Sequence, residues 1–280
     1  MVIHLKLPVV NDSEFLDAVV EERQAGRNAA YFNSIHSDWK LRVQGYVAAK
    51  GNPEVVKPWP GVAPHKKTLQ NLYLSPQEDS VQKPILDALR SRTLQLCPAC
   101  GEDGTPNTLD HYLPKETYPE FSITPANLFP MCDVCQGEKG TKTVNAGNER
   151  LFLHPYFDQF ADEQVVVLVI GRPFDAPTTI TIQPHPGLDA AQSALVSRHL
   201  EELDIARRYH RFFRNEYLRL LRLVQRTREQ GQDVRQNLEM FRDYALSKST
   251  NAWQHVLYAG VLADAELMAY LETGQLPDFL

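Results

Sequence analysis

Two stretches decide how the middle of this 280-residue chain folds: Cys97-Pro98-Ala99-Cys100 and Cys132-Asp133-Val134-Cys135. A Cys-x-x-Cys turn directs two thiolates at one centre, and two such turns complete a tetrahedral site for zinc. A redox-active pair is the alternative, but it would need only one such turn, at a strand-to-helix junction. The spacing therefore predicts a structural Zn²⁺, closed to water because four thiolates leave no open position. The predicted ligands are all four cysteines of the sequence, Cys97, Cys100, Cys132 and Cys135.

Between and just after the two cysteine pairs lie side chains suited to acid–base and metal chemistry. Asp110-His111 lies between the pairs, Asn127 lies shortly before the second pair, and Gln136 and Lys139 follow it. On its own, an aspartate beside a histidine would fit a solvated carboxylate next to a core histidine. Their placement between the two cysteine pairs favours a functional role.

In this order, the residues resemble the HNH nuclease family, whose ββα-metal motif lies within paired Cys-x-x-Cys turns in many bacterial members. The resemblance covers about residues 97–142. It implies an α+β fold class with a small zinc-stapled ββα-metal module, and an endonuclease that hydrolyses phosphodiester bonds in DNA with a divalent metal; RNA is a further candidate substrate. In the family the histidine of Asp-His is the general base, here His111. The carboxylate of Asp110 would hold the metal, and Asn127 would brace the loop across the two strands.

The chemistry suits two of these residues, and the sequence departs from the family at a third. A neutral imidazole accepts a proton from water near pH 7, and a carboxylate suits Mg²⁺, with Mn²⁺ as the alternative. Adjacent strand residues point to opposite sides, so the strand must be distorted for Asp110 and His111 to reach one site. The second metal ligand of the family is Asn or His, whereas this chain has Gln136, one methylene longer than Asn. The alternative function is therefore a zinc-stabilised nucleic-acid-binding or scaffolding subunit with a decayed nuclease site.

The patterning predicts three regions: a helical region at 1–94, the HNH module at 95–158, and a β-hairpin followed by helices at 159–280. Prolines and glycines make 51–65 a loop, and Gly231 is expected to end a long helix. Asp12 or Ser13 is expected to cap the first helix. Helices are expected at about 12–20, 28–50, 80–92, 190–229, 233–248 and 251–272, and strands at 165–170 and 178–182.

Arginines recur every three or four residues along the helix expected at 190–229. They form one stripe about 27 Å long at 1.5 Å per residue, opposite an apolar face. Such a stripe could follow a phosphate backbone or be a solvated face. His154 is a candidate for reaching the metal or a phosphate, although packing in the core is favoured. The stripe holds Arg208, Arg211, Asn215, Arg219, Arg222 and Arg226, and the expected nucleic-acid contacts are Lys115, Lys139, Arg211, Arg219 and Arg222, with Lys142 as a further candidate.

The bulk composition is that of an ordinary globular protein, with 43% hydrophobic and 23% charged residues. The net charge of −6 means that contact with nucleic acid must come from local basic surface. No apolar run approaches the roughly 20 residues of a membrane helix, and the start of the chain does not read as a leader, so no membrane partner and a cytoplasmic location are expected. The resemblance implies a role in bacterial restriction or phage defence, with DNA and an ATPase as partners; the flanking helices could also form a homo-oligomer.

Overall fold

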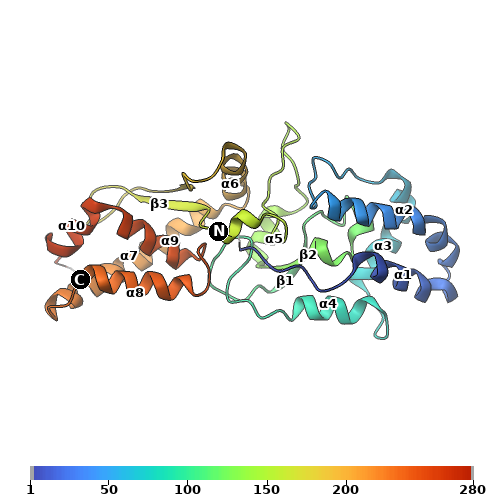
Figure 1. Ribbon diagram of the computed structural model, residues 1–280, viewed down its shortest axis with the longest axis horizontal. Coiled ribbons are helices and arrows are strands. Elements are labelled where there is room, and N and C mark those ends of the chain that lie inside the picture. Colours follow the sequence, from blue (N-terminus) through green and yellow to red (C-terminus); the bar gives the residue numbers. More distant parts are fainter. Residues whose placement is uncertain (1–2, 279–280) are drawn as a thin grey trace. The chain divides into compact units, whose positions relative to one another are not determined.

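The computed structural model describes residues 3–278, which divide into two compact units (Figure 1). One unit is formed by His4–Leu94 together with Thr105–Asp158. The other is formed by Gln95–Gly104 together with the chain from Gln159 onward. The positions after Leu94 and Asp158, where the sequence suggests region boundaries, also bound these units, but 105–158 packs with the N-terminal helices.

The N-terminal part of the first unit is helical, as expected, and contains one helix more than the sequence predicts. This helix is α3, which follows a 3₁₀ turn, η2 (Pro60–His65), at the end of the expected loop. Its apolar residues Leu69 and Leu72, three positions apart, are buried, so a single short face fixes it to the core. The elements here are α1 (Asp12–Glu22), η1 (Arg23–Ala25), α2 (Ala29–Ala48), α3 (Lys66–Leu74) and α4 (Gln82–Arg90).

The N-cap of α1 is Asn11, one residue before the first of the two expected positions. The Asn11 side chain accepts hydrogen bonds from the backbone N–H groups of Ser13 and Glu14, at 3.1 and 3.3 Å. The prediction that Asp12 or Ser13 caps this helix was therefore wrong. The kind of cap was nevertheless expected, because asparagine caps a helix as well as aspartate or serine does. Asp12 becomes the first helical residue, and its Oδ1 accepts a hydrogen bond of 3.4 Å from the N–H of Ala126.

The segment after residue 105 forms a strand, a second strand and a helix in that order. Strand β1 (Thr108–His111) pairs antiparallel with β2 (Leu128–Met131), and α5 (Asp133–Lys139) follows at once. Leu109 of β1 and Leu128 of β2 pack with leucines of α4, which attaches the strand pair to the helical region. The connection between the strands contains the 3₁₀ helices η3 (Pro119–Phe121) and η4 (Pro125–Asn127).

In the second unit, the 3₁₀ helix η5 (Gln159–Asp162) is followed by the expected β-hairpin. Strand β3 (Val166–Ile170) pairs antiparallel with β4 (Ile180–Pro184), which confirms that prediction. Helix α9 (Trp253–Ala263) packs against β3 at Gly260, where an added Cβ would lie 2.9 Å from the Leu168 carbonyl oxygen. Glycine is therefore required for this close approach of helix and strand.

Two of the expected C-terminal helices are each divided in two. The helix expected at 190–229 is α6 (Ala190–Glu202) and α7 (Ile205–Glu229), separated at Asp204, whose φ of 49° is left-handed. The helix expected at 251–272 is α9 and α10 (Ala265–Thr273), because Asp264 caps α10 by accepting from the Glu266 and Leu267 N–H groups. Helix α8 (Val234–Leu246) lies between them in sequence.

Gly231 ends α7 as predicted. Its φ is 66°, and its N–H donates to the Arg228 carbonyl at 2.9 Å, while the Gln232 N–H donates to the Thr227 carbonyl at 2.9 Å. This pair of bonds is the Schellman arrangement, which favours glycine at the left-handed position. Across residues 3–278, no helix combines the length and the apolarity that crossing a membrane requires.

Candidate functional site

The sulfur atoms of the four cysteines lie within 4.8 Å of one another. The first pair sits in a tight turn in which the N–H of Gly101 donates to the Cys97 carbonyl at 2.8 Å. In the second pair, Cys132 is the N-cap residue of α5, and its Sγ accepts from the Cys135 N–H at 3.5 Å. Zinc–sulfur bonds of about 2.3 Å in a tetrahedron require sulfurs about 3.8 Å apart. The four cysteines therefore form a site that can bind a metal such as zinc.

Asp110 lies near the end of β1 and is directed at α5. Its Oδ1 accepts a hydrogen bond from Gln136 Nε2 at 3.2 Å, and its Oδ2 lies 3.0 Å from Lys139 Nζ. Oδ2 is buried and accepts no hydrogen bond from any described residue. The side chain thus has one oxygen that accepts a hydrogen bond and one that faces only the Lys139 ammonium.

His111, the next residue, contacts a different set of neighbours. Its Nε2 is 2.8 Å from the Ser122 carbonyl oxygen, and its ring lies edge-on to Tyr73, with centroids 4.4 Å apart. Only 3% of the residue is exposed, and this burial lowers its pKa to about 4, against the opposing effects of the Ser122 hydrogen bond and the Asp110 charge. Strand alternation therefore directs Asp110 and His111 toward different elements, yet the two groups remain close enough to interact electrostatically.

The Asn127 side chain holds together the loop between β1 and β2. Its Oδ1 accepts from the Leu113 N–H at 2.8 Å, and its Nδ2 donates to the Leu113 and Phe121 carbonyl oxygens at 3.0 and 3.2 Å. Its own carbonyl accepts from the Tyr112 N–H. The side chain is fully buried, so all three of its hydrogen bonds replace contacts with water and fix the backbone just beyond His111.

Lys139 does not occupy the place expected for a phosphate contact. It is 1% exposed, and its Nζ donates to the His111 carbonyl at 2.7 Å in addition to its pairing with Asp110. The reason is helical spacing: three residues after Gln136, it points to the same face of α5. Lys115 remains half-buried, with Nζ 3.0 Å from Glu116 and 5.9 Å from the centre of the Tyr73 ring. Lys142 is exposed.

His154 is a core residue and not a ligand of the candidate site. Its Nδ1 accepts from the Tyr156 N–H at 3.1 Å, so the ring proton resides on Nε2, which lies 2.9 Å from the Tyr46 oxygen. The Tyr46 hydroxyl in turn lies 3.3 Å from the Ala126 carbonyl. Burial lowers the pKa of His154 well below its ordinary value, and with both nitrogens bonded the imidazole serves packing, the interpretation favoured from the sequence.

Tyr73 is the site residue that sequence reasoning missed. It lies on α3, and besides contacting His111 its hydroxyl donates to the Leu109 carbonyl at 2.7 Å. It is nearly forty positions from His111 in the sequence, and Leu69, Leu72 and Tyr73 give α3 only one short turn of apolar spacing. Only the tertiary contact reveals it.

The arginine stripe of α7 is exposed except at its first member. Arg211, Arg219 and Arg222 are exposed, as the sequence predicts, and Arg219 pairs with Glu216 at 2.5 Å. Arg208 is instead buried, so it does not belong to the exposed stripe. The opposite face is buried as expected, at Tyr209, Phe213, Tyr217, Leu220, Leu221 and Val224.

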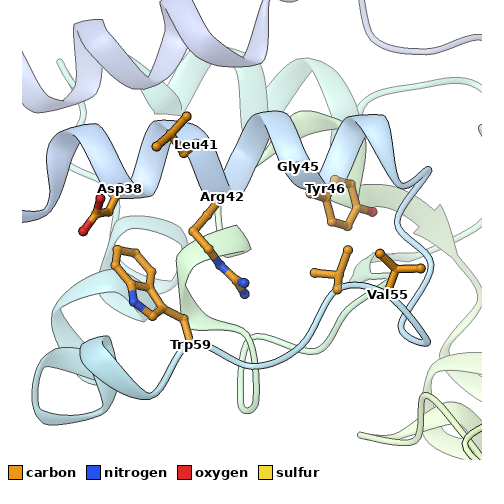
Figure 2. Close-up of a pocket in the computed structure, with 8 residues that line it drawn as sticks. Asp38, Leu41, Arg42, Gly45, Tyr46, Val55 and Trp59 are labelled. Carbon is orange, nitrogen blue, oxygen red and sulfur yellow. The ribbon is translucent and has the colours of Figure 1, made fainter.

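A separate hollow of about 400 Å³ lies beside α2 (Figure 2). Leu41, Val55 and Trp59 give it an apolar lining, and the Arg42 guanidinium enters it. Arg42 is held from behind by Glu120, at 2.6 Å. Asp110, His111 and Gln136 do not line this hollow.

The chain was compared with known proteins. No family model and no solved structure matches it. Protein ea31 of Escherichia phage lambda is 30% identical to it over 223 residues, which are 72% of this chain and 73% of the phage protein. The name of that phage protein states no activity. Because the similarity extends over most of both proteins, the chain belongs to the family of the phage protein ea31.

Proposed function

We propose that this chain is a metal-dependent endonuclease of the HNH type that hydrolyses phosphodiester bonds in DNA. The observation that carries the proposal is the end of β1, where Asp110, with a carboxylate oxygen that accepts no hydrogen bond, adjoins His111, whose Nε2 meets a carbonyl. A carboxylate that can hold a cation beside an imidazole that can accept a proton is what metal-assisted hydrolysis requires.

His111 would supply the general base. The Ser122 carbonyl can only accept, so the proton of the neutral ring resides on Nε2 and the lone pair on Nδ1. No hydrogen bond to Nδ1 from the described part of the chain competes for that lone pair. Burial lowers the pKa of His111 to about 4, so the imidazole is neutral at pH 7 and can accept a proton, but as a weaker base than a histidine with its pKa near 7.

Asp110 and Gln136 would hold the divalent cation, Mg²⁺ or Mn²⁺, since both offer oxygen ligands. Bound there, the cation would neutralise charge on the phosphate and the leaving oxygen. Zn²⁺ at the four cysteines would have a structural part, because four thiolates leave no site for water. Loss of this Zn²⁺ should destabilise the protein, but the ion itself would take no part in the reaction.

DNA would be bound through local basic surface despite the net charge of −6. The exposed Arg211, Arg219 and Arg222 of α7 are the candidate phosphate contacts, together with Lys115 beside the His111 cluster. Each such contact releases counterions, so binding should weaken steeply with salt. We extend the proposal to restriction or phage defence, with an ATPase as the protein partner, on the strength of the HNH resemblance alone.

The alternative is a zinc-stabilised nucleic-acid-binding or scaffolding subunit whose nuclease site has decayed. What favours it is that both Asp110 oxygens face protein donors: the Gln136 amide nitrogen at Oδ1 and the Lys139 ammonium near Oδ2. A cation would have to compete with both.

Plasmid nicking with Mg²⁺ or Mn²⁺ tests the proposal. Wild type is compared with His111→Ala and with His185→Ala, a histidine in the turn after β4 whose Nδ1 accepts from the Gly187 N–H. We expect cleavage by wild type and His185→Ala, and a loss of about 100-fold or more in His111→Ala because the base is removed. DNA binding by wild type with no cleavage at any metal concentration would favour the alternative.

A further inference from the structure

Arg208 stands apart from the other arginines of α7. It is 8% exposed, whereas Arg211, one turn further along the same helix, is exposed. A buried guanidinium requires a partner that offsets the cost of removing its charge from water.

That partner is the first cysteine turn, which belongs to the same compact unit. Nη2 of Arg208 donates to Cys100 Sγ at 3.4 Å and forms an ion pair with Glu102 Oε2. The guanidinium carbon also lies 5.6 Å from the centre of the Trp253 ring. Glu102 and Trp253 thus hold the guanidinium in position against the sulfur.

The backbone of the same turn is fixed by three further hydrogen bonds. The Ala99 carbonyl accepts from His199 Nε2 at 2.7 Å, and the Cys100 carbonyl accepts from Trp253 Nε1 at 2.6 Å. The Gly101 carbonyl accepts from the backbone N–H of Trp253 at 3.2 Å. Helices α6 and α9 therefore orient the turn, while Arg208 of α7 contacts the ligand atom itself.

The negative charge of a metal site with four thiolates explains why a guanidinium lies beside Cys100. Four thiolates around a divalent ion carry a net charge of −2, and Cys97, Cys100 and Cys135 are buried. A hydrogen bond from a cationic donor to a thiolate is the kind of outer contact that stabilises a bound metal. The sulfur of Cys100 is the ligand atom at which Arg208 supplies such a bond.

We propose that Arg208 is a positioning residue for a metal bound by the four cysteines: its N–H···S hydrogen bond and its charge slow dissociation of the metal from Cys100. The inference rests on metal binding by the cysteines and not on nuclease activity. Glu102 acts through Arg208, because it holds the guanidinium that touches the sulfur.

The test measures release of zinc from the full-length, zinc-loaded protein to excess chelator, followed with a metal-sensitive dye. Arg208→Met keeps much of the side chain's volume but removes the charge and the donors; Arg211→Met makes the same change at an exposed position of α7. We expect release to be about 10-fold or more faster in Arg208→Met, in the range for loss of an outer contact, and unchanged in Arg211→Met. The rate of zinc release from Glu102→Gln should lie between the rates of these two variants.

A second measurement separates this contact from a general loosening of the fold. In Co²⁺-substituted protein, loss of a hydrogen bond to a thiolate raises the energy of its lone pair and moves the sulfur-to-cobalt charge-transfer band to lower energy. We expect that shift in Arg208→Met and not in Arg211→Met. Equal release rates for the two methionine variants, or an unmoved band, would overturn the role of Arg208.

Arg208→Lys keeps the proposal testable if Arg208→Met fails to fold. Lysine retains the charge but lacks the planar fork of donors, so release faster than wild type is expected and release at the wild-type rate overturns the proposal. A wild-type protein that is well folded without metal would overturn both this inference and the zinc site, yet leave plasmid cleavage as a separate question.

Discussion

Lys139 Nζ lies 3.0 Å from Asp110 Oδ2, and both residues are buried. The ammonium therefore faces the carboxylate oxygen that accepts no hydrogen bond. The same Nζ donates to the His111 carbonyl, so one side chain connects α5 to two consecutive residues of β1. A divalent ion at Asp110 would share or displace this ammonium.

This arrangement predicts that Lys139→Met destabilises the protein strongly. Removing one partner of a buried ion pair leaves an uncompensated charge, which costs about 3–5 kcal/mol. A divalent ion at Asp110 would restore the missing charge, so Mn²⁺ should raise the Tm of Lys139→Met more than that of wild type. Thermal unfolding with and without Mn²⁺ measures this, with Lys142→Met, at an exposed position, as the control. An equal effect of Mn²⁺ on both variants would contradict the replacement of the Lys139 charge by an ion at Asp110.

Asn127 predicts a stability effect that depends on its hydrogen bonds and not on catalysis. Asn127→Ala leaves the buried N–H and carbonyl groups of Leu113 without partners, at about 1–3 kcal/mol for each unsatisfied group. We expect a loss of about 2–4 kcal/mol in the free energy of unfolding, measured with urea. The exposed Asn215→Ala on α7 should change it by no more than about 0.5 kcal/mol. A similar loss in both variants would show that the hydrogen bonds of Asn127 to Leu113 add nothing to the free energy of unfolding.

The sequence predicted the parts of this site that depend on local chemistry. The clustering of the four cysteines and the hairpin of β3 and β4 needed only short-range patterns. It could not predict what depends on tertiary packing. Arg208 and Arg211 have the same chemistry and helical face, yet only Arg208 is buried against Cys100 and Glu102.

The same limit explains the breaks in the C-terminal helices. Asp204 and Asp264 each interrupt a pattern whose apolar periodicity continues on both sides. Aspartate tolerates left-handed and capping conformations, but it also occurs on exposed helix surfaces, so a single aspartate gives no clear signal. The burial of Lys139 could not be predicted from the sequence either, because lysine in a polar segment is usually exposed.

Asp12 predicts a pH dependence of stability in the first unit. Burial raises its pKa to about 6 from 3.8, opposed by backbone hydrogen bonds from Ala126 and from its own N–H. Since the folded state then binds the proton more tightly than the unfolded state, stability is highest below about pH 4 and falls as the pH rises toward 6. A shift of about two units corresponds to at most about 3 kcal/mol, and the partial exposure of Asp12 reduces this to about 1–2 kcal/mol.

Asp12→Asn should therefore raise the free energy of unfolding at pH 7.5 by about 1–2 kcal/mol while keeping the acceptor for Ala126. Urea unfolding at pH 4 and pH 7.5 measures it, because the gain must shrink at pH 4, where the aspartate is neutral. Asp189→Asn, at the exposed cap of α6, provides a matched control in the other unit. A gain that is the same at both pH values would contradict the cause assigned to it.

Gln136 gives the last prediction, which follows from the atoms it presents to Asp110. Its Nε2 donates to Asp110 Oδ1 at 3.2 Å, so its amide must turn over to offer an oxygen to a cation shared with Asp110. Asparagine is shorter by one methylene and cannot reach Asp110 as easily, which frees its oxygen for the metal. We expect Gln136→Asn to keep or raise plasmid cleavage and to lower the Mg²⁺ concentration for half-maximal rate. Gln136→Ala should raise that concentration or abolish cleavage.

Metal titrations of cleavage by wild type, Gln136→Asn and Gln136→Ala distinguish three cases. If both variants behave as wild type, Gln136 does not hold the metal; His154 is then no substitute, because both of its ring nitrogens are already bonded inside the core, and water must complete the shell. If wild type is inactive and Gln136→Asn cleaves, the chain has lost nuclease activity at this residue and serves in binding. Only the ordered series, with Gln136→Asn needing the least Mg²⁺ and Gln136→Ala the most, agrees with Gln136 as a working ligand whose extra methylene weakens its hold on the metal.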